Sequence, residues 1–155
     1  MAATATGQST VPFVARAAKR GDRAGARRSV LAGYLVALPV VAASGALVWA
    51  ASGTVVGLFT DDPGVASAVT ALLPVLLVVV VADAAQVLPG MGLLGIKRPR
   101  ASMYAFAFCY GPLALAAAPV AEAGGLPLLW ALYAVAVCGL VVGQGLAFWR
   151  SSARI

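Results

Sequence analysis

The chain has 155 residues, of which 62% are hydrophobic and only 10% are charged. A soluble domain of this size needs more polar surface, so the composition excludes a soluble globular protein and favours a membrane protein. The formal net charge is +6, but the basic residues lie in clusters between long apolar tracts, which argues against nucleic-acid binding. Histidine is absent, and with it the usual metal ligand and neutral-pH acid–base group. We therefore expect a protein that is not an enzyme and that has no metal site and no cofactor.

Residues 1–28 are expected to form a helix stub followed by a basic cytoplasmic loop. The apolar stretch VPFVA is too short for the core of a signal peptide. An Arg-rich start that lacks acids is also typical of a transit peptide, but Val11 to Ala18 has the composition of a helix end that runs into a turn at Gly21 and Asp22. We expect the last turns of a helix whose beginning is missing.

Four apolar tracts follow, at about residues 29–51, 65–95, 101–120 and 126–149. Each is long enough for the ~20 residues that a transmembrane helix needs. The outer two of the three turns between them carry acidic residues, and the middle turn is basic. All 11 basic residues then fall on one side of the membrane, which places both termini in the cytoplasm by the positive-inside rule. We expect an all-α, multi-pass protein of the cell membrane, with residues 29–155 as its four-helix domain.

The second tract is longer than one membrane crossing requires. As a straight helix it would span roughly 46 Å, against a hydrocarbon core of ~30 Å, so it must tilt, bend or protrude. Pro74 and Pro89 are the expected bending points, because proline removes a backbone donor and clashes with the preceding turn. Pro39 should bend the first tract for the same reason.

The start of the second tract carries a capping signal. Asp61 or Asp62 can accept hydrogen bonds from the first free backbone amides, and Pro63 has a φ that suits the first helical turn. We therefore interpret both aspartates as structural.

Asp83 lies in the middle of the second tract and is the only Asp, Glu, Lys or Arg within the four tracts. It precedes Lys97 by about 14 residues, roughly 21 Å along a helix, so its carboxylate falls in the hydrocarbon zone. A carboxylate there costs on the order of 2.5–3.5 kcal/mol, and desolvation disfavours its charged form. Because Gln86 and Gly90 share its helix face, we expect this face to point into the protein or a water-filled cavity.

A carboxylate held near the point of ionisation suits proton or sodium coupling, so Asp83, with Gln86 beside it, is the candidate coupling site. The alternative is that Asp83 only hydrogen-bonds a neighbouring helix and stabilises packing.

The fourth tract contains Gly139 and Gly143 in a GxxxG spacing, which predicts close packing against another helix, within the chain or in a partner. Trp130 and Tyr133 lie near its outer end, where aromatic rings with a polar edge favour the headgroup zone. The two cysteines, Cys109 and Cys138, lie in apolar runs, and we expect them to be buried small hydrophobes.

Four stretches of the chain, in order, resemble the multidrug and toxic compound extrusion (MATE) transporters. They are FVARAAKRGDRAGARR, GLFTDDPGV, LLPVLLVVVVADAAQVLPGMGLLG and YGP. The matching positions are Gly21, Asp22, Ala26, Arg27, Leu58, Phe59, Thr60, Asp61 or Asp62, Val65, Leu73, Pro74, Asp83, Gln86, Gly95, Tyr110, Gly111 and Pro112. Three features depart from the family pattern: Lys19 replaces a glycine, Leu94 replaces an arginine, and the polar residue expected before Tyr110 is absent.

The resemblance implies a multidrug efflux antiporter of twelve helices in two lobes of six, coupled to H⁺ or Na⁺. An acidic residue of the tenth helix takes part in coupling in that family, and Asp83 matches its position. The chain corresponds to the last four helices and a stub of the eighth, part of the second lobe. We therefore expect a partial or truncated chain that needs a second chain to supply the rest, with organic cations or drug-like compounds as substrates.

Two other functions remain open. A small four-helix multidrug carrier that acts as a dimer has a similar length, but such carriers have their essential glutamate in the first span, whereas the acid here lies in the second. A non-transporting membrane subunit would use Asp83 for packing alone. Replacement of Asp83 by Asn separates these functions, since packing tolerates the amide and coupling does not.

Overall fold

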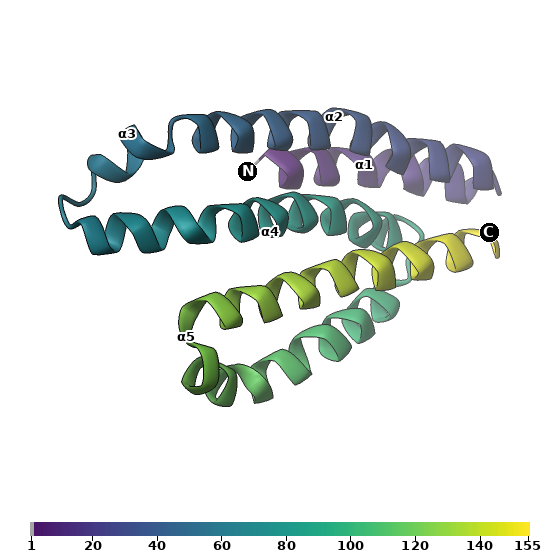
Figure 1. Ribbon diagram of the computed structural model, residues 1–155. Helices are drawn as coiled ribbons and strands as arrows, with labels where there is room; N and C mark the ends of the chain where they lie inside the picture. Colours follow the sequence, from purple (N-terminus) through teal and green to yellow (C-terminus); the bar gives the residue numbers. More distant parts are fainter. Residues whose placement is uncertain (1) are drawn as a thin grey trace.

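The computed structural model describes residues 2–155, which are helical almost throughout and contain no strand. The elements are α1 (Ala2–Lys19), α2 (Arg23–Ala50), the short α3 (Ser52–Gly57), α4 (Pro63–Gly95) and α5 (Pro99–Ser152), as Figure 1 shows. Inside α5, Gly125 has a non-helical backbone, with φ 65° and ψ −158°. The chain reverses there, so α5 consists of two arms, residues 99–124 and 126–152.

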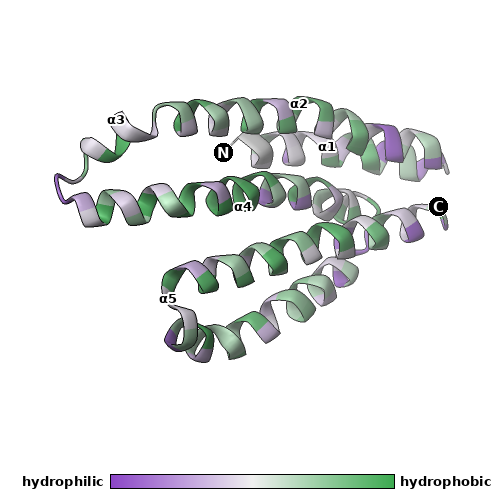
Figure 2. Cartoon of the chain, in the orientation of Figure 1, coloured by the Kyte–Doolittle hydropathy of each residue, from purple (hydrophilic) through white to green (hydrophobic). Residues whose placement is uncertain are grey.

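The helices α2, α4 and α5 are long and apolar enough to cross a membrane. With the reversal inside α5, the apolar helical segments correspond to the four expected tracts. In Figure 2, hydrophobic residues cover most of the helix length and hydrophilic residues gather at the turns and ends. The expected fold class, an all-α membrane protein, is confirmed.

The structure differs from the expected boundaries in two places. Residues 23–28 belong to α2 and not to a basic loop, because Asp22 caps the helix by accepting a hydrogen bond from the Gly25 amide at 2.7 Å. The turn between the last two tracts consists of Gly125 alone. Its φ is positive, which glycine adopts without strain because it has no Cβ atom.

The start of α4 follows the predicted cap. Asp62 Oδ1 accepts hydrogen bonds from the backbone amides of Gly64 at 2.7 Å and Val65 at 3.4 Å, and Pro63 occupies the first turn. Of the two candidate aspartates, Asp62 is therefore the capping residue.

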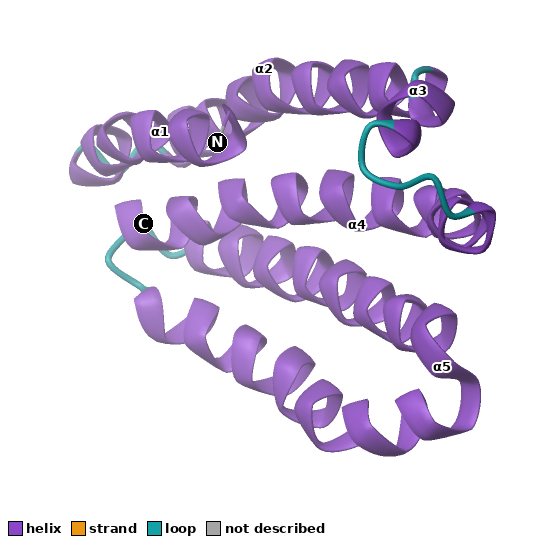
Figure 3. Ribbon diagram, turned by 90° about the vertical axis from the view of Figure 1, so that its left-hand side faces the viewer, coloured by secondary structure: helices purple, strands orange, loops and turns teal. Residues whose placement is uncertain are grey.

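Helix α4 lies at the centre of the molecule and contacts α1, α2 and α5. Figures 1 and 3 show α1 running beside α2, while the two arms of α5 form a hairpin on the other side of α4. The α1–α2 turn, the α4–α5 turn and the C-terminal residues lie together at one end, which we call the basic end. The main buried cluster also lies toward this end and consists of Val14, Ala26, Val30, Ala37, Leu88, Leu93 and Phe148.

The two cysteines do not follow the expectation of burial. Cys109 is half-buried between the arms of α5, and Cys138 is exposed on the second arm. A thiol on a lipid-facing helix surface carries little cost because it behaves as a small apolar group.

Candidate functional site

The two residues predicted as the coupling site, Asp83 and Gln86, contact each other in the middle of α4. Gln86 Nε2 donates a hydrogen bond to Asp83 Oδ1 at 3.2 Å, as expected for residues three apart on a helix. Gln86 is buried, with 8% of its surface exposed, whereas Asp83 is exposed. Within this chain the carboxylate therefore has one amide donor on its own helix and an open side, and it is not enclosed as we expected.

An aromatic cluster that spans both α5 arms reaches this carboxylate through one residue. Tyr110, on the first arm, is close enough to Asp83 for an electrostatic interaction. Its ring stacks on Phe106, with centroids 5.7 Å apart, and lies 6.1 Å from the ring of Tyr133 on the second arm. Trp130 contacts Tyr133 edge-on at 5.7 Å, which extends the aromatic cluster along the second arm.

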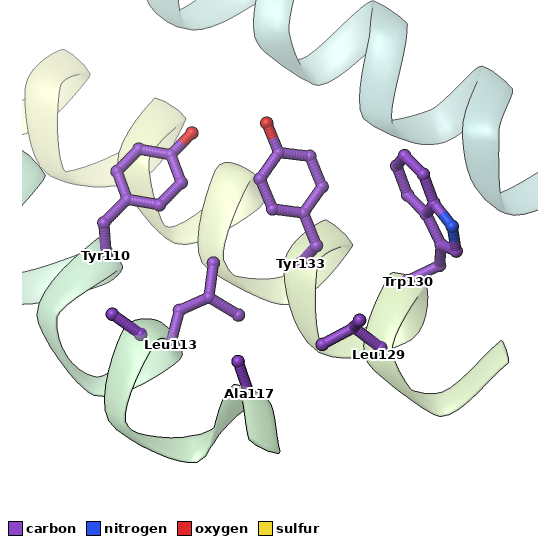
Figure 4. Close-up of a pocket in the computed structure, with 7 residues that line it drawn as sticks. Tyr110, Leu113, Ala117, Leu129, Trp130 and Tyr133 are labelled. Atoms are coloured by element: carbon purple, nitrogen blue, oxygen red, sulfur yellow. The ribbon is translucent and has the colours of Figure 1, made fainter. Parts of the chain in front are cut away.

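The aromatic cluster borders a cavity of about 460 Å³ between the two arms of α5. Its lining residues are Tyr110, Leu113, Ala114, Ala117, Leu129, Trp130 and Tyr133, and Figure 4 shows the phenol oxygens of the two tyrosines pointing to the same side. A pocket of this size with mostly apolar walls is typical of small-molecule sites. The aromatic faces can also attract an organic cation.

A second polar group lies nearer the basic end, between α4 and α5. Gln144 is fully buried, and its Nε2 donates to Ser102 Oγ at 3.0 Å. Its Oε1 has no hydrogen-bond partner among residues 2–155. This oxygen lies against Gly90, where a Cβ atom would be only 2.8 Å away, so the glycine makes room for the amide. Together with Gln86, these residues line a cavity of about 300 Å³.

The predicted bending residues all lie inside helices, Pro39 in α2 and the other two, Pro74 and Pro89, in α4. Pro89 is buried, whereas Pro39 and Pro74 are exposed. Both helices continue through their prolines, and the role of these residues in bending remains a prediction.

The glycines of the GxxxG spacing face the first arm of α5. A Cβ at Gly139 would lie 3.5 Å from Cys109 Sγ, and one at Gly143 would lie 3.6 Å from the Cβ of Ala105. These are ordinary van der Waals distances, so the two arms approach closely here but would also accept alanine.

Sequence reasoning missed the pairing of Gln144 with Ser102 and the cavity between the α5 arms. Trp130 and Tyr133, the expected interfacial aromatics, also line that cavity. One signal was available: Gln144 is the only Asn, Gln, Ser, Thr or charged residue in the tract 126–149. A single amide in such a tract indicates a polar contact between helices.

Comparison with known proteins gives a consistent family assignment. The MatE family model matches residues 1–120. The "Probable multidrug resistance protein NorM" of Xanthomonas campestris pv. campestris is 30% identical over 155 residues, which covers 96% of this chain and 33% of the relative. The protein of the same name from Xanthomonas axonopodis pv. citri is 30% identical over 154 residues, with the same coverage. The chain thus spans about a third of the length of these relatives, and no solved structure matches it significantly.

Proposed function

The chain belongs to the MatE family, and from this premise we propose that it forms part of a cation-coupled multidrug efflux antiporter in the cell membrane. The family assignment and the apolar helices make it a multi-pass membrane protein. The multidrug resistance names of its relatives support drug efflux as the activity. The distribution of basic residues supports cytoplasmic termini.

The observation that carries this proposal is the electrostatic interaction of Asp83 with Tyr110, which lines the aromatic cavity. A carboxylate attracts a cation, and the rings of Tyr110, Tyr133 and Trp130 offer flat apolar surface and cation–π contacts to a lipophilic cation. The same carboxylate can instead hold H⁺ or Na⁺. Because the two kinds of cation compete for one negative charge, binding of one weakens binding of the other, and this reciprocity is what an antiporter requires.

The proposed transporter needs helices beyond those of this chain. Alternating access moves one structural repeat against another around a central site, and the relatives are about three times as long as this chain. We propose that the missing helices, from the same polypeptide or from a second chain, pack against the open side of Asp83. Their presence would remove the carboxylate from lipid, which lowers the cost of keeping it in the hydrocarbon zone.

Export of ethidium from cells that lack their own pumps tests the proposal. The chain is expressed alone and together with the two thirds of the Xanthomonas campestris relative that it does not match, and insertion is checked by immunoblot. We expect export from the combination, loss of export with Asp83→Asn, and no loss with Glu122→Gln, which removes a charge near the Gly125 turn.

Equal export by the unchanged chain and Asp83→Asn would show that the carboxylate serves packing alone. The family assignment leaves no support for the small four-helix carrier, so the non-transporting subunit is the function to which that result would point.

A further inference from the structure

A separate cavity of about 290 Å³ lies at the basic end, where three segments far apart in sequence meet. The end of α1, the α4–α5 turn and the C-terminal residues form its walls. Four of the residues that line it are cations, and none is Asp or Glu: Lys19, Lys97, Arg98 and Arg154. We call this cavity the cationic pocket.

The pocket cations form no ion pair within residues 2–155. All four are exposed, and the structure gives their side chains no hydrogen-bond partner among residues 2–155. By contrast, nearby Arg27 donates to Ser152 Oγ and to the Trp149 carbonyl, each at 3.0 Å, and lies 4.1 Å from the Trp149 ring. Ile155 also lines the pocket, but its backbone oxygen already accepts a hydrogen bond from Arg23 Nε at 3.2 Å.

The dipoles of the helices that end at the pocket neutralise only part of the positive charge of these four side chains. The C-terminal ends of α1, α4 and α5 all lie at the pocket, and each contributes roughly −0.5 of an elementary charge. Three such ends offset about 1.5 of the four positive charges. The N-terminal end of α5 at Arg98 adds about +0.5 and a carboxylate at Ile155 takes away one, so a positive surplus of about two charges remains, and it favours an anion in the pocket.

Lys97 is held in a backbone conformation that favours glycine. Its φ is 59°, and the amides of Lys97 and Arg98 donate to the carbonyls of Leu94 and Leu93 at 2.9 and 2.8 Å. This is a Schellman motif, in which glycine is usual at the left-handed position and another residue costs about 1–2 kcal/mol. A lysine at that position places a cation at the pocket in spite of the backbone cost.

We propose that the cationic pocket binds a phosphate group, supplied by the headgroup of an anionic lipid. Its location supports the lipid as the source, because Gly95 and Ile96 in its wall end the apolar helix α4, and so place the pocket at the level of the headgroups. Basic pockets between membrane helices are typical sites for anionic headgroups. The inference does not depend on Asp83 or on transport.

Isothermal titration of the full chain in neutral detergent micelles tests the proposal. The ligands are short-chain phosphatidylglycerol, phosphatidylcholine of the same chain length, and glycerol 3-phosphate as a soluble phosphate ester. We expect phosphatidylglycerol to bind most tightly. Each Lys or Arg near a membrane surface contributes about a fivefold gain in affinity for anionic lipid, so Arg98→Gln/Arg154→Gln should weaken binding about 30-fold.

The matched control is Arg28→Gln/Arg100→Gln, which removes the same charge from exposed residues outside the pocket and should weaken binding less than about threefold. An equal loss in both double variants would overturn the pocket and leave only a diffuse surface potential. Absence of preference for phosphatidylglycerol over phosphatidylcholine would also overturn it. If glycerol 3-phosphate binds as tightly as the lipid, the lipid assignment is overturned in favour of a soluble phosphate ester.

Lys97→Gly separates binding from stability. Glycine relieves the left-handed backbone, so the thermal midpoint should stay the same or rise, while loss of the cation weakens phosphatidylglycerol binding about fivefold. A variant that is as stable as the unchanged chain and binds the lipid equally well would contradict a role for Lys97 in the pocket.

Discussion

The basic end of the molecule and the opposite end are built from the same apolar helices but differ in how these helices are packed. At the basic end α1 lies against both α2 and α4, and Val14, Leu93 and Phe148 are at most 1% exposed. Toward the opposite end α1 is absent, and large apolar side chains such as Phe59 and Leu115 are 86% and 85% exposed.

Lipid explains why both arrangements are compatible with one composition. Apolar side chains gain little by leaving lipid for a protein interior, so helix association depends on close van der Waals contact and on polar contacts between helices. The basic end supplies such contact through glycines: a Cβ at Gly92 or Gly95 would lie 2.8 Å from a neighbouring side chain. Toward the opposite end Gly53 and Gly57 have no neighbour within 4 Å of a Cβ position, although a Cβ at Gly45 of α2 would lie 2.9 Å from Leu77 of α4.

The comparison therefore indicates that the basic end provides most of the close packing of this chain, while the part around Asp83 and the α5 hairpin keeps open surfaces, which we propose serve substrate and further helices. Matched substitutions at the two kinds of position test this division.

The largest expected difference is between two phenylalanines. Phe148 is 1% exposed and Phe108 is 81% exposed. Truncation of a buried phenylalanine removes packing and leaves a cavity, so Phe148→Ala should lower the free energy of unfolding by about 3–5 kcal/mol, and Phe108→Ala by less than about 1 kcal/mol. Unfolding by sodium dodecyl sulfate in mixed micelles, followed by circular dichroism, measures both. Similar losses would mean that the basic end is not the stable part.

A smaller effect is expected from added methyl groups. In Gly95→Ala the new Cβ would lie 2.8–2.9 Å from Val14 and 3.2 Å from the Val11 carbonyl, so we expect overpacking to cost about 1–3 kcal/mol. Gly145→Ala meets no atom within 4 Å and should be neutral or stabilising by up to about 1 kcal/mol, because alanine favours the helix. The same unfolding assay applies, and a destabilising Gly145→Ala would contradict the packing described for the second arm.

Loss of the hydrogen bond to the buried amide of Gln144 is expected to lower the free energy of unfolding by about 1–2 kcal/mol. Ser102→Ala removes the acceptor of its Nε2 and leaves a second unpaired polar atom, which should destabilise the chain by about this amount. Gln144→Met removes both the donor and the unpaired Oε1 and should be close to neutral. In the Gln144→Met background Ser102→Ala should then cost less, and purely additive effects would show that the hydrogen bond contributes nothing.

The smallest effect concerns the cap of α4. Asp62→Ala loses the hydrogen bonds to the first free amides and should cost about 1 kcal/mol. Asp61→Ala, at an exposed neighbour outside the cap, should change the free energy of unfolding by less than about 0.5 kcal/mol. The unfolding midpoints of the two variants measure the difference. A larger loss of stability in Asp61→Ala would contradict the assignment of Asp62 as the capping residue.

Local features were predictable from the sequence, and contacts between helices were not. The four apolar tracts, the cap at Asp62 and the contact of Asp83 with Gln86 depend on residues within one or two turns of each other. The meeting of Tyr110 with Tyr133 depends on how the chain reverses at Gly125. Helices that face lipid carry little apolar–polar periodicity, so the sequence does not mark which face meets another helix.

The exposure of Asp83 shows the same limit. Its expected depth in the membrane follows from helical rise, but the direction of its side chain depends on the neighbours of α4. The sequence pattern indicated that such a carboxylate needs protein or water around it. It did not indicate that this chain leaves one side of the carboxylate open.

Binding of a lipophilic cation beside Asp83 tests the central claim most directly. In a Trp49→Phe/Trp149→Phe background, Trp130 in the aromatic cavity is the sole tryptophan, and its fluorescence reports titration with tetraphenylphosphonium in neutral nanodiscs. We predict saturable quenching that Asp83→Asn weakens by about tenfold or more and Glu122→Gln leaves unchanged. Equal binding by Asp83→Asn and the unchanged chain would contradict the role of this carboxylate in holding the cation.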